Sequence, residues 1–215
     1  MKWIEKNLKN EPKSLRLHRQ KSFSTYDNYA EKDDLRKILL EEQGYICCYC
    51  MGRIQTPTQD KMKIEHWQAQ SKFPDSELLY ENLLASCRGN EWSNSKEYHC
   101  DLSKSESIIS INPTDKAMMS QISLSRNGLI NIKNASLQKE IDDILNLNND
   151  ILKTQRISVY KGVTRFLKKE FGQKNPTKAV LNKAIKQCSE KKNGKFEPYC
   201  AVIIYFLTKA LANAL

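Results

Sequence analysis

The chain has 215 residues, of which 40% are hydrophobic and 28% are charged, and it carries a formal net charge of +10. This composition is typical of a globular protein and excludes a disordered chain, and no apolar run approaches the roughly 18 residues of a membrane helix. The first residues, 1-MKWIEKNLKNEPK-13, lack the apolar core of a secretion signal, so we expect a cytoplasmic protein without a membrane partner. The positive charge favours a polyanionic partner such as DNA or RNA, with solubility alone as the alternative.

The N-terminal part of the chain predicts an arm followed by a helix. Residues 1–30 are polar and irregular, which is typical of an arm or a short helix. The next stretch, 31-EKDDLRKILLEEQG-44, predicts a helix, because acidic residues crowd its first turns, apolar residues share one face and Gly44 follows it. A group of cysteines, beginning at Cys47, follows directly after this helix.

The middle of the chain predicts short strands separated by turns. Residues 62–67 and 83–87 are the candidate strands, and the polar stretch 88–99 between the second strand and Cys100 is a predicted loop. After that loop, 101-DLSKSES-107 predicts a short helix, since Asp and Ser favour a first turn.

The last part of the chain predicts a hairpin and then helices. Residues 107–132 contain alternating apolar positions and an Asn127-Gly128 turn, which indicate a hairpin. Residues 137–215 are mostly helical in pattern, and the apolar run 200-CAVIIYFL-207 fits a buried helix segment or a strand. The elements together predict an α+β protein.

Seven cysteines, an odd number, argue against a disulfide framework and favour metal ligation or burial. Cys47 and Cys50 form a Cys-x-x-Cys pair, and Cys87 with Cys100 could complete the four thiolates of a structural zinc site. The alternative is that Cys87 and Cys100 are ordinary buried thiols, and the zinc site fails if the 88–99 loop separates them. The remaining cysteines are assigned to burial: Cys48, Cys188 and Cys200.

A glutamate and one of only three histidines stand side by side between these cysteine pairs, at Glu65-His66. A carboxylate suits a hard cation such as Mg²⁺, and a neutral imidazole suits the removal of a proton from water near pH 7. Taken alone, such a pair is more typical of a surface without function. Its position inside the cysteine frame favours a site.

The order of these motifs, 47-CCYC-50, 65-EH-66, 82-NLLASC-87 and 100-CDLSK-104, resembles the HNH endonuclease family with its ββα-metal site. The chain is more closely similar to the PtuB-like nuclease subunit of Septu-type anti-phage systems, a group also found beside retrons. The resemblance covers most of the chain, including Trp3, 145-LNLN-148 and the 196–209 tail. The matching stretches are 43-QGYICCYCMGRI-54, 63-KIEHWQAQS-71, 80-YENLLASCRG-89, 99-HCDLSK-104 and 111-INPTD-115.

The resemblance implies a role for each residue of the motif. His66 would be the general base, Glu65 a ligand of the catalytic Mg²⁺ or Mn²⁺, and Asn82 the residue that holds the loop around the base. Asp101 would be the second cation ligand, although the family has Asn or His there, and His99 is the alternative for that role. The four cysteines named above would bind the structural zinc.

The resemblance also implies the architecture and the partners. We expect a ββα-metal core with a zinc site at 46–135, an arm and helix at 1–45, and a helical region at 136–215 that packs on the core and docks a partner. The implied partners are nucleic acid, an ATPase of the SMC or ABC type (PtuA-like), and, beside a retron, the reverse transcriptase and its msDNA. The implied function is the effector nuclease of an anti-phage defence complex.

Two other functions remain open at this stage. A non-catalytic zinc-dependent module that binds nucleic acid would keep the charge and the cysteine frame but leave Glu65-His66 unexplained. An HNH-type RNase that acts on tRNA or other RNA would use the same site, because attack by water neither needs nor forbids a 2′-OH. Arg88 and Lys104 are candidate phosphate contacts or ordinary surface residues, and Trp67 is expected in the core.

Overall fold

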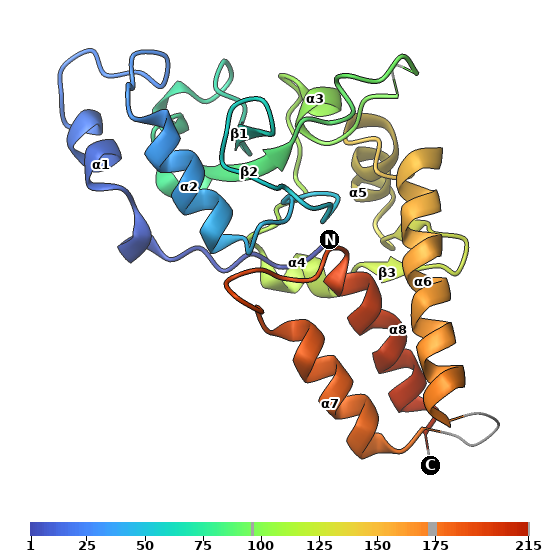
Figure 1. The fold of residues 1–215 in the computed structure, drawn as a ribbon. Coiled ribbons are helices and arrows are strands. Elements are labelled where there is room, and N and C mark those ends of the chain that lie inside the picture. The colour runs from blue at the N-terminus through green and yellow to red at the C-terminus, as the bar shows by residue number, and fades with distance from the viewer. Residues whose placement is uncertain (96, 172–175, 215) are drawn as a thin grey trace.

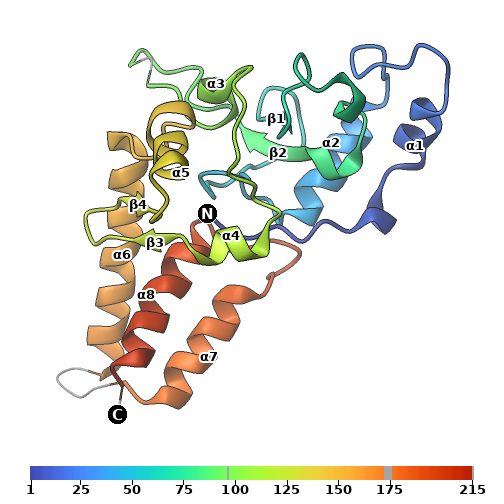
Figure 2. The ribbon, with the colours of Figure 1, turned by 180° about the vertical axis from the view of Figure 1, so that it is seen from behind.

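The computed structural model describes residues 1–95, 97–171 and 176–214, and it is an α+β structure (Figure 1). A small β-hairpin lies among the N-terminal helices on one side, and three longer helices, α6 to α8, extend from it on the other. The view from behind shows the same division (Figure 2). Within the described residues, no helix combines the length and the apolar character that a membrane span requires.

The arm contains helix α1 (Lys13–Arg19), and the predicted helix is α2 (Lys32–Glu42). Two aspartates in the first turn of α2 favour the helix electrostatically. The helix ends before Gly44, whose φ of +61° places a hypothetical Cβ only 2.4 Å from the ring of Phe196, so a larger residue is excluded there. The apolar face of α2 is fully buried through Leu35, Leu39 and Leu40.

The two predicted strands are confirmed as β1 (Met62–His66) and β2 (Leu83–Cys87), which pair antiparallel with Glu65 opposite Leu84. The long connection between them contains two 3₁₀ turns, Pro74–Ser76 and Tyr80–Asn82. Helix α3 (Asp101–Lys104) follows the loop after β2 and is shorter than the predicted 101–107. The chain therefore runs strand, strand, helix through the region that carries the motif residues.

The predicted second hairpin is also confirmed, although its strands are only two residues long: β3 (Ser123–Leu124) and β4 (Ile130–Asn131). Its turn lies at Asn127-Gly128, where the Gly128 N–H donates to the Ser125 carbonyl over 2.9 Å. The elements around this hairpin are α4 (Lys116–Ser120), α5 (Ala135–Lys139) and a π-helical turn at Glu140–Ile144. A further 3₁₀ turn, Leu8–Asn10, lies in the N-terminal arm before α1.

The C-terminal region is helical, as predicted, in the residues that the structure describes. It consists of α6 (Asp150–Phe171), α7 (Lys178–Ser189) and α8 (Cys200–Ala212), so the apolar run 200–207 is a helix and not a strand. These helices share a small core around Val163, Leu181 and Leu207. The main core draws residues from all three predicted parts of the chain, for example Ile4, Tyr49 and Val202.

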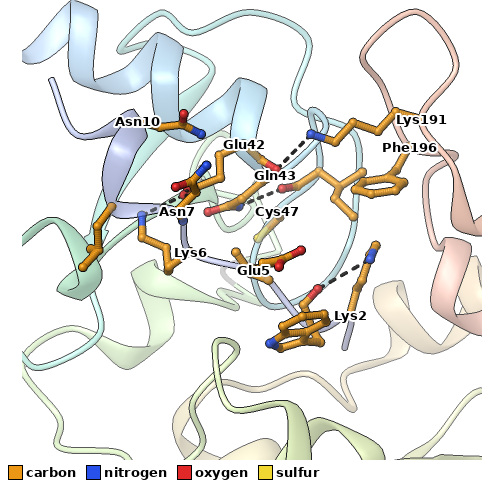
Figure 3. A pocket seen from close by; sticks show the side chains of 14 residues that line it. Lys2, Glu5, Lys6, Asn7, Asn10, Glu42, Gln43, Cys47, Lys191 and Phe196 are labelled. Atoms are coloured by element: carbon orange, nitrogen blue, oxygen red, sulfur yellow. Dashed lines mark hydrogen bonds and ion pairs between the residues drawn. The ribbon is translucent and has the colours of Figure 1, made fainter.

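Figure 3 shows how the N-terminal arm and the segment after α7 are fastened to the end of α2, around a cavity of about 600 Å³. Lys6 pairs with Glu42 at 2.8 Å, and Lys191 donates to the carbonyls of Glu41 and Glu42 at 2.8 and 3.1 Å. Cys47 lies at the edge of this cavity. Lys6 and Lys191 therefore already have partners. We assign their positive charges to holding the N-terminal arm and the segment after α7 against the end of α2.

Candidate active site and cysteine cluster

The four predicted cysteines come together in space. The sulfur atoms of Cys47, Cys50, Cys87 and Cys100 all lie within 4.8 Å of one another. Two of these pairs, Cys47–Cys100 and Cys50–Cys87, are separated by 3.8 Å. Tetrahedral zinc with Zn–S bonds of about 2.3 Å would separate its thiolates by about 3.8 Å. The cluster therefore fits a zinc ion.

The loop that follows β2 closes on itself and does not separate the cysteines. Gly89 has a φ of +62° and lies so close to the chain that a Cβ there would be 2.3 Å from the His99 carbonyl oxygen. The His99 N–H in turn donates to the Gly89 carbonyl over 3.1 Å. This contact brings Cys87 and Cys100, at opposite ends of the loop, to the same place.

The sulfur of Cys47 lies among the other thiols of the cluster. Burial raises its pKa, but the hydrogen-bonding contacts with Cys100, Cys48 and Cys50 outweigh burial and leave the pKa well below its usual range, which favours the thiolate that binds metal. His99 is buried beside this cluster, with its Nδ1 atom 3.1 Å from the sulfur of Cys100. This contact places His99 beside the cysteines.

Glu65 is buried at the centre of a second polar cluster. One of its carboxylate oxygens, Oε1, accepts hydrogen bonds from the Tyr49 hydroxyl and from the Lys104 ammonium group, each at 2.7 Å. Lys104 also donates to the His66 carbonyl over 2.7 Å, so it fastens α3 to the end of β1. The expectation of Lys104 as a surface residue or phosphate contact is wrong, because its side chain is only 1% exposed.

Asp101, the first residue of α3, lies next to Glu65. Burial, and then the hydrogen-bonding carboxyl of Asp101, raise the pKa of Glu65 well above its usual range, against the opposing charge of Lys104. Asp101 itself pairs with the ammonium group of Lys63 at 3.2 Å. Two adjacent carboxylates are the oxygen donors that Mg²⁺ and Mn²⁺ prefer, so Glu65 and Asp101 fit a divalent cation.

The cation site differs in completeness from the cysteine cluster. Among residues 1–95, 97–171 and 176–214, the cysteine cluster brings at least three metal-ligating side chains to metal-binding distance. The carboxylate pair supplies only two ligands, Glu65 and Asp101. A cation held by Glu65 and Asp101 would therefore need further ligands from water or from a substrate phosphate.

His66 ends β1 and has one ring nitrogen fixed by the main chain. Its Nε2 atom lies 3.1 Å from the Glu77 carbonyl oxygen. A carbonyl only accepts, so Nε2 carries the proton and the neutral ring keeps a lone pair on Nδ1. Burial lowers the pKa of His66 to about 4, although the Glu77 carbonyl opposes this shift. The ring is therefore neutral near pH 7, as a general base must be.

Asn82 holds the chain on both sides of this histidine contact. Its Oδ1 atom accepts from the Gln68 N–H at 2.7 Å, and its Nδ2 group donates to the Gln68 and Ser76 carbonyls at 3.1 and 3.0 Å. Gln68 follows His66 by two residues, and Ser76 precedes Glu77. Asn82 thus fixes the two segments whose separation determines the hydrogen bond between His66 and the Glu77 carbonyl.

Two tyrosines of the site were not predicted. Tyr26 packs its ring edge against the imidazole of His66, with ring centroids 4.4 Å apart and an interplanar angle of 89°. Burial is the main cause that raises its pKa to about 12. Tyr49 lies within the quoted CCYC motif, but its hydrogen bond to Glu65 has no signature in the sequence. Tyr26 comes from the polar arm, where no periodicity or motif singles it out.

The remaining expected residues have structural contacts. Trp67 packs partly in the core and donates its indole N–H to the Ile111 carbonyl at 2.9 Å, which supports the core assignment. Arg88 pairs with Glu91 and donates to the Gln59 carbonyl at 3.1 Å. These contacts leave no observation that favours Arg88 as a phosphate contact.

No family model matches the chain. The chain is similar to a protein of Vibrio cholerae serotype O1 biovar El Tor described as "Retron Vc95 putative HNH endonuclease". The two are 29% identical over 173 residues, which cover 76% of this chain and 80% of the other. This similarity supports the HNH endonuclease family. It also agrees with the order of motif residues along β1, β2 and α3, and it indicates nuclease activity.

Proposed function

We propose that this protein is a metal-dependent HNH endonuclease that hydrolyses phosphodiester bonds in nucleic acid. The observation that carries the proposal is the pair of adjacent carboxylates, Glu65 and Asp101, together with the imidazole of His66, which ends the same strand as Glu65 and has its Nε2 atom fixed by the Glu77 carbonyl. The strand–strand–helix segment that presents these residues is closed by four cysteines that fit zinc. The similarity to the Vibrio protein supports the same activity.

In this mechanism the residues of the site divide the work between proton transfer and charge stabilisation. His66 takes a proton from the attacking water at Nδ1, and the Glu77 carbonyl stabilises the resulting imidazolium through Nε2–H. Glu65 and Asp101 would hold Mg²⁺ or Mn²⁺, which when bound supplies Lewis-acid stabilisation of the charge that builds on the phosphate oxygens. Asn82 keeps the imidazole in the orientation that the reaction requires.

The cysteine cluster has a structural role in this proposal. Four thiolates leave zinc no open position for water or substrate, which is the arrangement of structural and not catalytic sites. Lys104 completes the frame, because it neutralises Glu65 and ties α3 to the carbonyl of His66. The frame and the chemistry thus depend on different residues that are adjacent in the chain.

The experiment that tests the activity uses purified protein, DNA and total RNA, with Mg²⁺ or Mn²⁺. The wild type is expected to cut at least one of these substrates, and His66→Ala is expected to lose cleavage while its zinc content and its nucleic-acid binding stay unchanged. Unchanged cleavage by His66→Ala would exclude the mechanism. A wild type that binds but cuts neither DNA nor RNA would favour the non-catalytic zinc module.

We further propose that the nuclease is the effector of an anti-phage complex with an ATPase of the SMC or ABC type and, in a retron, with the reverse transcriptase and its msDNA. The resemblance to PtuB-like subunits and the word retron in the name of the Vibrio protein support this. Helices α6 and α7 expose Phe166 and Val180 and are the proposed docking surface. Phe166→Ser with Val180→Ser should weaken capture of an ATPase encoded beside the protein without changing zinc content.

A further inference from the structure

One arginine near the candidate site has a buried hydrogen-bond donor without an acceptor in the described residues. Arg36, on α2, is 9% exposed, yet its described partner is the Asp33 carboxylate at 2.5 Å, and Asp33 is 89% exposed. Within the described residues, the buried Nε atom of Arg36 has no hydrogen-bond partner. A buried donor without an acceptor is unfavourable, so a group that accepts from this guanidinium would be stabilised there.

A second buried arginine shows the contrast. Arg156 donates from Nε to the Gly128 carbonyl at 2.5 Å and from Nη2 to the Leu147 carbonyl at 2.6 Å. Its guanidinium joins the second hairpin to the start of α6 and serves the fold, although its buried Nη1 atom also has no hydrogen-bond partner within the described residues. Arg36 makes no comparable contact with main-chain carbonyls in the described part of the chain, because its partner is an exposed acid one turn back on its own helix.

The face of α2 that carries Arg36 also carries Lys32, which contacts the tyrosine ring that packs on the candidate catalytic histidine. Lys32 and Arg36 are four residues apart and so share one face of the helix. The ammonium group of Lys32 lies 4.8 Å from the centroid of the Tyr26 ring, and that ring packs against His66. Figure 1 shows α2 beside the β1–β2 hairpin. Tyr26 therefore joins α2 to the end of β1.

Arg36 and Asp101 both act on the pKa of the Tyr26 hydroxyl. Burial is the largest effect on the pKa of Tyr26 and raises it, the charge of Arg36 lowers it, and the charge of Asp101 raises it. These effects agree with the position of α2 beside the β1–β2 hairpin. Lys63 and Lys104 are already paired with the candidate cation ligands Asp101 and Glu65, and Lys32 donates to the Asp27 carbonyl over 3.1 Å.

We propose that Arg36 binds a phosphate of the nucleic acid next to the bond that is cut, and that Asp33 occupies its guanidinium when no substrate is bound. This inference rests on the proposed nuclease function and extends it by a residue outside the motif. A guanidinium presents two parallel N–H donors that match two phosphate oxygens. The Asp33 carboxylate is 89% exposed and an ion pair with so exposed a partner is weak, so a phosphate can displace it from the Arg36 guanidinium.

The first test measures binding and not cleavage. In a His66→Ala background, the affinity for fluorescein-labelled DNA and RNA oligonucleotides is measured by anisotropy over a range of salt concentrations. Arg36→Gln is compared with Lys37→Gln, which removes the same charge from an exposed neighbour on the same helix. Arg36→Gln should bind about 10- to 100-fold more weakly than Lys37→Gln. The slope of log K against log salt should fall by about 0.7 to 0.9, the value for one lost phosphate contact.

A second pair of variants distinguishes phosphate binding from a merely structural role. Asp33→Asn removes the competing carboxylate, and Asp34→Asn removes the charge of its exposed neighbour in the same helical turn. If Arg36 binds phosphate, Asp33→Asn should bind the oligonucleotides about 2- to 5-fold more tightly than Asp34→Asn. If Arg36 only anchors the start of α2, the two variants should have equal affinity and Asp33→Asn should unfold at a lower temperature.

The outcomes separate this inference from the proposed function. Affinity and salt slope of a folded Arg36→Gln protein that equal those of Lys37→Gln would overturn the inference. If Arg36→Gln does not fold, the Asp33→Asn comparison decides, and equal affinities overturn it. A wild type that fails to cut while the Arg36 salt effect persists would refute the nuclease proposal and leave the phosphate site standing. Arg36→Lys should recover part of the lost affinity, because it keeps the charge but not the two parallel N–H donors of the guanidinium.

Discussion

The cysteine cluster and the carboxylate cluster lie at neighbouring positions of one short segment, yet only the cysteine cluster has a complete set of metal ligands. Cys100 belongs to the first cluster and Asp101 to the second. The cysteine cluster brings four ligands together at the spacing of a filled tetrahedral site. The carboxylate cluster brings two anions together and pairs each with a lysine, Glu65 with Lys104 and Asp101 with Lys63. The first is complete and closed, and the second is left open for further ligands.

The difference between the two clusters explains how a small hairpin can hold a charged site. Two adjacent charged carboxylates repel each other, and the charge of the buried one, Glu65, is costly without a partner. Lys104 lowers that cost for Glu65, and the cysteine cluster with its metal would keep α3 in place, so that Asp101 remains opposite Glu65. Each prediction below removes one part of this arrangement.

The largest effect is expected from loss of the cysteine cluster. Cys100→Ser should lose the zinc and unfold the hairpin region, because a structural zinc contributes on the order of 10 kcal/mol to folding. Cys188→Ser, a cysteine outside the cluster, is the control and should keep one zinc per chain. Metal analysis and thermal unfolding measure both. A Cys100→Ser protein with full zinc content would contradict the assignment.

The next effect concerns the buried lysine. Lys104→Met removes the buried ammonium group that pairs with Glu65, which should lower the free energy of unfolding by about 3–5 kcal/mol. Lys63→Met breaks the more exposed pair with Asp101 and should cost about 1 kcal/mol or less. Urea denaturation measures the two. Equal losses would show that Lys104 does not have the role assigned to it.

The sequence predicted the frame of the molecule well and its interior charges poorly. The Cys-x-x-Cys spacing, the two short strands and the helix before Gly44 follow from local patterns, and all three are present in the structure. Lys104 was expected at the surface because lysine is rarely buried, and only its contact with Glu65 explains its burial. No local pattern reports such a long-range pair.

The geometry around His66 depends on contacts that no side-chain pattern encodes. The Glu77 carbonyl fixes the ring through the main chain, and any residue at that position supplies a carbonyl. Tyr26 reaches the imidazole from a polar arm 40 residues earlier, a separation set by the packing of the arm and not by a motif. Asn82 was predicted only through the family resemblance.

A smaller effect is expected from the asparagine that positions the base. Asn82→Ala removes the contacts to Gln68 and Ser76 and should lower kcat about 100-fold, because a small displacement of a reacting group has an effect of that order. Zinc content and oligonucleotide affinity should stay unchanged. Asn131→Ala, in the second hairpin, is the control and should leave cleavage unchanged. A loss in affinity in place of kcat would assign Asn82 to substrate binding.

The smallest effect is expected from the second carboxylate. Asp101→Asn keeps an oxygen ligand but removes a negative charge, and the charge of the ligands tunes the affinity for hard cations. We expect half-maximal cleavage to need about 10-fold more Mg²⁺, with a similar maximal rate. A titration of cleavage against Mg²⁺ measures this. An unchanged Mg²⁺ requirement would remove Asp101 from the cation site.

The central claim is that zinc frames the site and a separate divalent cation supports the chemistry. The most direct measurement is single-turnover cleavage by protein that contains its zinc, with and without added Mg²⁺ or Mn²⁺, while the zinc content is recorded. We predict binding without cleavage when the second cation is omitted, and cleavage on its addition at constant zinc content. Cleavage by the zinc-loaded protein without any added cation would contradict this account.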